Sequence, residues 1–121
     1  MPETTAIDLF CRVVDNYGDI GVCWRLARQL VAEHGCAVRL FVDDLHAFRY
    51  LAPEIDPAQP EQALLGVRVL HWPLAETLAP AEVVIEAFAC DPPAAYVAAM
   101  AARAPKPVWL NLEYLSAEAW V

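Results

Sequence analysis

The stretch VVDNYGDIGVCWRLARQL, residues 13–30, joins an apolar strand to an amphipathic helix through a short turn. The apolar run ends at Asp15, and from about Gly21 the apolar residues recur at three- and four-residue spacing, as on one helical face. We therefore predict a strand, a turn and a helix over about 21–34. The turn holds two carboxylates, Asp15 and Asp19, which are the first candidate functional residues.

These two carboxylates set the turn apart from phosphate-binding loops. A turn between a parallel strand and a helix commonly binds phosphate through its free N–H groups. Here neither the dinucleotide-binding nor the P-loop glycine pattern is present. Two negative charges repel a pyrophosphate and attract a cation, a guanidinium or a sugar hydroxyl. The alternative is structural, because Asp19 at a helix start and Asp15 at a strand end are common positions for this residue.

The negative net charge of the chain indicates which kinds of binding partner are favoured. The chain of 121 residues carries a net charge of −8, from 16 acidic and 8 basic residues. Such a surface repels nucleic acid and favours a neutral or basic partner. No apolar run reaches the roughly 18–20 residues that span a bilayer, and residues 1–8 contain no basic export signal. We predict a cytoplasmic protein that binds neither nucleic acid nor membranes.

The four cysteines do not form a metal-binding pattern. Their spacing contains no C-x-x-C pair, and each lies in an apolar segment. We predict reduced core cysteines and no metal site; the residues are Cys11, Cys23, Cys36 and Cys90.

Strand and helix signals alternate along the chain. The predicted strands are 7–14, 37–43, 67–72, 82–88 and 108–112, and 54–66, with Pro57 and Pro60, is predicted as a surface connection. Asp43 or Asp44 is expected to cap a short helix, and Asp91 a longer one with Pro92 and Pro93 in its first turn. This alternation predicts one α/β domain: a Rossmann-like open parallel sheet with helices on both faces.

In such sheets, ligands bind beyond the carboxyl ends of the strands. The residues expected at these ends are acidic and aromatic, and they fall in the ranges 15–19, 43–44, 71–72, 86–91 and 111–114. The turn with Asp15 and Asp19 is the best candidate site among them.

Four segments carry a resemblance to a known family. They are FCRVVDNYGDIGVCWRLARQL, RLFVDD, VVIEAFACDPP and WLNLEYLSAE. Together they resemble the N-terminal part of the EarP family, the arginine rhamnosyltransferases of translation elongation factor P. The resemblance runs from about Ile7 to the last residue.

This resemblance implies an inverting glycosyltransferase of GT-B architecture, with two Rossmann-like domains facing a cleft. Rhamnose is transferred from dTDP-β-L-rhamnose to an arginine of elongation factor P, and no cofactor is needed besides this donor. Residues 1–121 would be the truncated acceptor-side domain, without the C-terminal nucleotide-sugar domain. Such a fragment is expected to be inactive alone.

The resemblance also assigns roles to residues. It implies that Asp19 is the general base and that Asp15 is also required for catalysis. The implied substrate-binding residues are Asn16, Tyr17 and Gly18 in the turn, and Glu113 and Tyr114 on the acceptor side.

Two other functions remain open from the residues alone. The chain could be a non-catalytic acidic module that binds elongation factor P or another basic domain. It could also be a small dinucleotide-binding oxidoreductase with Asp43 at the ribose, although the missing glycine fingerprint counts against this.

Overall fold

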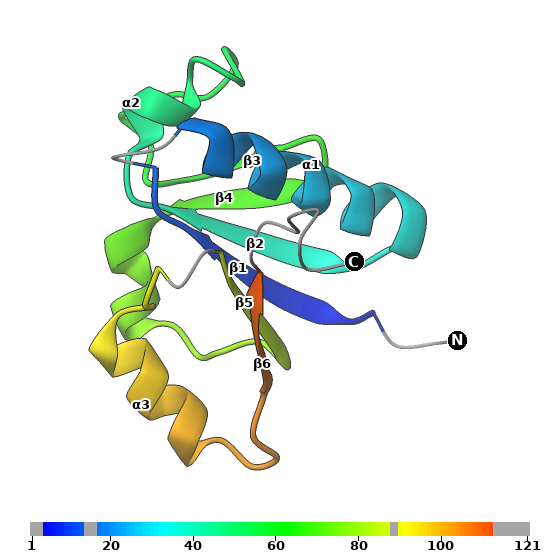
Figure 1. Ribbon diagram of the computed structural model, residues 1–121, viewed down its shortest axis with the longest axis vertical. Coiled ribbons are helices and arrows are strands. Elements are labelled where there is room, and N and C mark those ends of the chain that lie inside the picture. Colours follow the sequence, from blue (N-terminus) through cyan, green and yellow to red (C-terminus); the bar gives the residue numbers. More distant parts are fainter. Residues whose placement is uncertain (1–3, 14–16, 88–89, 113–121) are drawn as a thin grey trace, which may run out of the picture.

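The structure, a computed structural model, describes residues 4–13, 17–87 and 90–112. Its centre is a six-stranded sheet in the order β3–β4–β2–β1–β5–β6 (Figure 1). All pairings are parallel except that of β3 with β4. The predicted α/β, Rossmann-like open sheet is therefore confirmed. The strands are β1 Ala6–Cys11, β2 Ala37–Val42, β3 Glu61–Leu64, β4 Val67–His71, β5 Val83–Ala87 and β6 Val108–Leu112.

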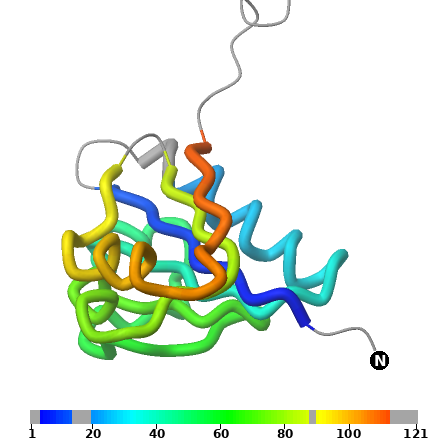
Figure 2. The backbone as a smooth tube through the Cα atoms, turned by 90° about the horizontal axis from the view of Figure 1, so that it is seen from below, coloured from blue at the N-terminus to red at the C-terminus, as the bar shows by residue number. Residues whose placement is uncertain are grey.

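Helices cover both faces of this sheet. The helix α1, Tyr17–His34, and the short α2, Leu45–Phe48, pack on one face. The 3₁₀ helix η1, Trp72–Thr77, and α3, Ala94–Ala102, pack on the other face. Figure 1 shows α1 and α3 on opposite sides of the strands, and in the tube of Figure 2 the orange to red β6 runs beside the yellow-green β5.

The central strand β1 has apolar side chains on both faces of the sheet, and helices bury both. Ile7, Leu9 and Cys11 belong to the core under α1, whereas Phe10 belongs to the core under α3. The Phe10 ring stacks on Phe41 of β2 with 4.6 Å between ring centroids. A strand that is buried on both faces has a nearly continuous apolar sequence, as this one has.

The first helix begins earlier than predicted. It starts at Tyr17 rather than at about Gly21, and β1 ends at Cys11 rather than at Val14. The backbone of Asp19 therefore lies in the first turn of α1 and not in the connecting turn. Ile20 is fully buried against the sheet, and such packing outweighs the low helix propensity of the nearby glycines.

The prediction of a surface connection over 54–66 is wrong in its second half. This stretch contains β3, which pairs antiparallel with β4 at the edge of the sheet. The turn between the two strands is Leu65–Gly66, and both residues have positive φ, of 52° and 81°. Two left-handed residues match the twist of a two-residue hairpin.

The helix starts were predicted with mixed success. The Asp44 side chain caps α2 by accepting the Ala47 N–H at 3.0 Å, as expected. Asp91 does not cap α3, because its φ is +55° and Pro93 occupies the cap position. Asp91 adopts the left-handed backbone conformation, which Asp tolerates better than most residues. This conformation changes the direction of the chain before the helix begins.

A buried carboxylate joins three parts of the fold. Asp8 of β1 is fully buried and accepts two hydrogen bonds of 2.6 Å from the Arg39 guanidinium of β2. It also accepts the Ala81 N–H at 3.0 Å and the hydroxyl of Tyr96 in α3. The hydrogen bonds that Arg39 donates to Asp8 raise the pKa of Arg39, and burial raises the pKa of Tyr96 above its usual range. This network holds α3 against the centre of the sheet.

We expect the isolated chain to self-associate. Among the described residues, Val108, Trp109 and Leu110 of the edge strand β6 are 55%, 48% and 50% exposed. Contiguous exposed apolar surface on an unpaired strand edge promotes association. Analytical ultracentrifugation should show a mass that rises with concentration, and Leu110→Lys should reduce this rise. A concentration-independent monomer with a cooperative melting transition would contradict the expectation.

Candidate functional site

The strand order creates a crevice beside β1. The chain runs from β1 outward through β2 to β4, and then returns to form β5 on the other side of β1. The segments that follow β1 and β5 therefore lead to helices on opposite faces, α1 and α3. The space outside the carboxyl ends of two such strands is where open α/β sheets bind ligands. We call the carboxyl ends of β1 and β5 the switch point.

The predicted catalytic and substrate-binding residues in the range 15–19 follow β1 in the sequence. Asp15 and Asn16 lie outside the described residues, in the connection between Val13 and α1. Tyr17, Gly18 and Asp19 are the first three residues of α1, so their backbones contribute to its N-terminus. The N–H groups of a first helical turn have no partner within the helix and carry a partial positive charge.

Glu113 and Tyr114 directly follow β6 and also lie outside the described residues. The side-chain roles of these two residues and of the residues in 15–19 stay predictions. What the fold establishes is that the connection from β1 to α1 begins at the switch point.

Asp43 has a role that the sequence did not reveal. Its Oδ1 accepts the backbone N–H of Val13 at 2.6 Å. Its carbonyl oxygen lies 3.2 Å from Nε2 of His71. Asp43 therefore fixes the chain immediately before the segment that contains Asp15. Because one carboxylate oxygen already holds the backbone, this residue is less suited to the ribose-binding role of a dinucleotide enzyme.

A second carboxylate at the switch point is Glu86, the penultimate residue of β5. It lies opposite Phe10 of β1 and Asn111 of β6, on the face that α3 covers. Its exposed fraction is only 7%. The sequence placed it in the acidic rim but gave no indication that it is buried.

The neighbouring Cys90 has a structural role. Burial raises the pKa of its thiol to about 12, and its Sγ donates to the Phe10 carbonyl oxygen at 3.5 Å. A thiol with such a pKa is not a nucleophile near neutral pH. Cys11, Cys23 and Cys90 are buried, as predicted for core cysteines, whereas Cys36 is only partly buried. Within the described ranges, no three His, Cys, Asp or Glu side chains lie together as metal ligands.

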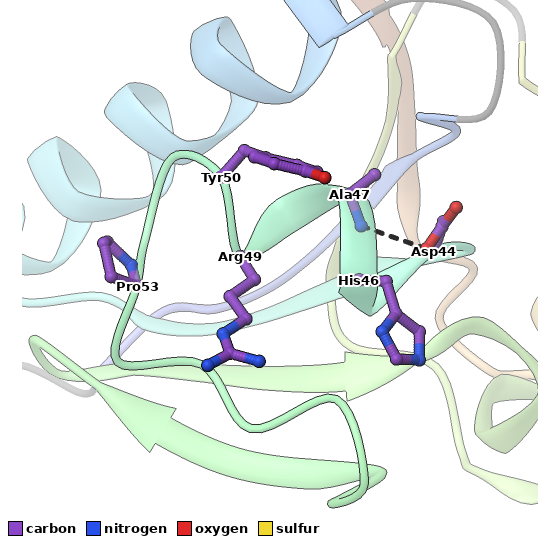
Figure 3. A pocket seen from close by; sticks show the side chains of 6 residues that line it. All are labelled: Asp44, His46, Ala47, Arg49, Tyr50 and Pro53. Carbon is purple, nitrogen blue, oxygen red and sulfur yellow. Dashed lines mark hydrogen bonds between the residues drawn. The ribbon is translucent and has the colours of Figure 1, made fainter.

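A hollow of about 570 Å³ lies beside α2, lined by Asp44, His46, Ala47, Arg49, Tyr50 and Pro53 (Figure 3). It follows β2, on the side of β1 away from β5. The Asp44 carboxylate on its wall is occupied as the helix cap. This hollow therefore borders the switch point but is not part of it.

No helix in the part of the chain that the structure describes is long and apolar enough to cross a membrane.

Comparison with known proteins shows the family to which this chain belongs. Residues 7–121 match the family model described as Elongation-Factor P (EF-P) rhamnosyltransferase EarP. The chain is 67% identical over 115 residues to a protein-arginine rhamnosyltransferase of Pseudomonas putida and 60% identical over 116 residues to one of Pseudomonas aeruginosa. A protein-arginine rhamnosyltransferase of Neisseria meningitidis is 46% identical over 112 residues.

These matches cover almost all of this chain but a smaller part of the relatives. They include 94% of the chain for the two Pseudomonas proteins and 91% for the Neisseria protein. The chain spans only 30%, 31% and 29% of the length of these curated relatives. Since the family model matches most of its residues, the chain belongs to the EarP family of elongation factor P rhamnosyltransferases.

Proposed function

We propose that this chain is the acceptor-binding N-terminal domain of an inverting GT-B glycosyltransferase in the cytoplasm. The complete enzyme transfers rhamnose from dTDP-β-L-rhamnose to an arginine of elongation factor P. The family match over residues 7–121, which includes the whole stretch from Asp15 to Asp19, carries this proposal. The switch point immediately before that stretch supports it, because α/β sheets bind ligands there.

Asp19 is the proposed general base. A guanidinium has a pKa above 12 and is a poor nucleophile while it is charged. A carboxylate with an ordinary pKa near 4 does not remove that proton before the reaction. Asp19 would instead orient the acceptor nitrogen by a charge-assisted hydrogen bond and accept the proton as the carbon–nitrogen bond forms. Inversion at the anomeric carbon needs no carboxylate nucleophile on the enzyme.

The remaining predicted residues have binding roles in this proposal. Asp15 would help to hold the acceptor or the shape of the connection, and its negative charge would favour a cationic sugar in the transition state. The turn residues Asn16, Tyr17 and Gly18 would contact the donor sugar. Glu113 and Tyr114 would lie on the acceptor side, and most of the nucleotide would bind a C-terminal domain.

A second candidate function is binding without catalysis. The net charge of −8 favours a basic partner, and this holds for a docking module as well as for an enzyme domain. Titration of the chain with elongation factor P, dTDP-rhamnose and NAD tests both candidates against a dinucleotide-binding enzyme. Both candidates predict binding of elongation factor P, whereas binding of NAD alone would contradict both.

We expect no rhamnosylation by residues 1–121 alone. In our proposal, most contacts to the sugar nucleotide belong to a C-terminal domain, and without them the high effective concentration of a bound donor is lost. The measurement is mass spectrometry of elongation factor P after incubation with this chain and dTDP-β-L-rhamnose. A deoxyhexose on the acceptor arginine would show that the chain is active by itself.

A further inference from the structure

The hollow beside α2 is lined by side chains of the kinds that recognise proteins. Its volume of about 570 Å³ lies within the range of about 300–1,000 Å³ that binding pockets have. Tyr50 on its wall is 82% exposed, which makes it the most exposed large hydrophobic side chain in the described part of the chain. His46 and Arg49 are also exposed, and Figure 3 shows both extending to the same side of α2. Tyrosine and arginine are enriched among the residues that dominate binding energy in protein interfaces.

The backbone that carries these side chains is held firmly by the core. Phe48 of α2 is fully buried, and its ring centroid lies 5.1 Å from that of Trp24 in α1. Leu45 is 4% exposed, and the Asp44 side chain caps the helix. A partner that binds the hollow therefore meets a backbone that is already ordered, which lowers the entropic cost of binding.

The hollow adjoins the first turns of α1. Leu51, which follows Tyr50, has its Cδ1 atom only 3.9 Å from where a Cβ atom on Gly21 would lie. Gly21 comes two residues after Asp19, the proposed general base. In our proposal the C-terminal domain follows β6, whereas α2 follows β2 on the other side of β1. This arrangement leaves the α2 side of the candidate site for the protein acceptor.

We propose that the hollow beside α2 binds the segment of elongation factor P that flanks the acceptor arginine, an inference that rests on the proposed function. When an arginine of a folded protein reaches Asp19, the residues next to it contact the surface around the first turns of α1, which includes the hollow. The Tyr50 ring would pack against an apolar side chain of that segment. The Arg49 guanidinium would donate hydrogen bonds to its carbonyl or carboxylate oxygens.

The first test is the affinity of the chain for elongation factor P, measured by calorimetry for the parent, Tyr50→Ala and Arg49→Ala. We expect each substitution to weaken binding about tenfold to a hundredfold, as for residues at the centre of an interface. Lys106→Ala is the control for the lost positive charge, because Lys106 is exposed and precedes β6, at the amino edge of the sheet. This control should bind within about twofold of the parent. If both hollow variants also bind like the parent, the docking proposal is overturned while the proposed function stands.

The acceptor arginine is then replaced by glutamine in elongation factor P. Because the hollow binds a neighbouring segment, Tyr50→Ala and Arg49→Ala should each weaken binding by the same factor with both acceptors. If the losses vanished with the glutamine acceptor, the hollow would bind the arginine itself, and the proposal would be wrong.

Turnover distinguishes docking from catalysis and from donor binding. In an enzyme that joins residues 1–121 to the remaining part of the Pseudomonas putida relative, both variants should raise the KM for elongation factor P and change kcat little. The KM for dTDP-β-L-rhamnose should stay unchanged. A rise in the donor KM alone would assign the hollow to the sugar nucleotide and overturn the proposal.

A measurement on the unmutated chain does not depend on how the variants fold. In a cross-saturation NMR experiment, bound elongation factor P should reduce the amide signals of Tyr50 and Arg49 and leave that of Lys106 unchanged. Unreduced signals for Tyr50 and Arg49 in the complex would overturn the proposal. If the parent chain itself does not bind elongation factor P, the proposed function fails, and the docking role of the hollow fails with it.

Discussion

Asp19→Asn is expected to lower turnover by roughly 10²- to 10⁴-fold, which is the usual contribution of a positioned general base. The enzyme for this measurement joins residues 1–121 to the remaining part of the Pseudomonas putida relative. Asparagine keeps the shape of the side chain but removes the charge and most of the basicity. Asp15→Asn should also lower turnover, because the acceptor or the connection after β1 would be held less well.

The fold should tolerate the Asp19 substitution. The residue lies in the first turn of α1, where a negative charge stabilises the helix by only about 0.3–1 kcal/mol. The melting temperature should therefore change little. If both acids were only structural, Asp19→Asn would keep a rate within a few-fold of the parent at an unchanged melting temperature. That result would remove Asp19 from the mechanism.

Asp8→Ala is expected to destabilise the chain by about 3–5 kcal/mol, the usual cost of removing one partner of a buried ion pair. The substitution leaves the Arg39 guanidinium, whose side chain is 19% exposed, without its carboxylate. It also leaves the Ala81 N–H and the Tyr96 hydroxyl without their acceptor. The free energy of unfolding is measured by urea denaturation of the parent and the variant.

Glu61→Ala provides the matched control for Asp8→Ala. It breaks another arginine–carboxylate pair, Arg68–Glu61, in which the two side chains are 53% and 46% exposed. Exposed pairs contribute at most about 1 kcal/mol, so this variant should unfold close to the parent. If Asp8→Ala cost no more than Glu61→Ala, the buried network would not be what holds α3 to the sheet.

The sheet could be predicted because its strands have a clear sequence signal. Short apolar runs such as residues 37–42 and 83–87 are typical of parallel strands that helices cover on both faces, and they alternate with helical patterns. The strand β3 was missed because EQAL has little apolar character and follows two prolines. Its structure depends on pairing with β4 and on the left-handed turn at Leu65 and Gly66, which are tertiary effects.

The candidate site was predicted less completely than the fold. The sequence singled out the Asp15–Asp19 stretch because its two acids distinguish it from phosphate-binding turns, and the roles of these residues stay predictions. It did not reveal what Asp43 and Asp8 do, or that Glu86 is buried, because their environments come from residues distant in sequence. Asp43 binds the backbone of Val13, and no local pattern records such a contact. Glu86 is buried on β5, which pairs with β1 and β6, and these strands are distant from it in sequence.

The central position of β1 has a consequence for synthesis on the ribosome. Ile7 pairs with Val38 on one side and with Val83 on the other. At about 5–20 residues per second, the ribosome adds Val83 roughly 4–15 s after Ile7. Throughout that interval, the growing chain has an apolar strand with at least one open edge, at which a second nascent chain could pair. A chaperone that shields β1 until β5 emerges should therefore raise the yield of folded protein more than one that acts after release.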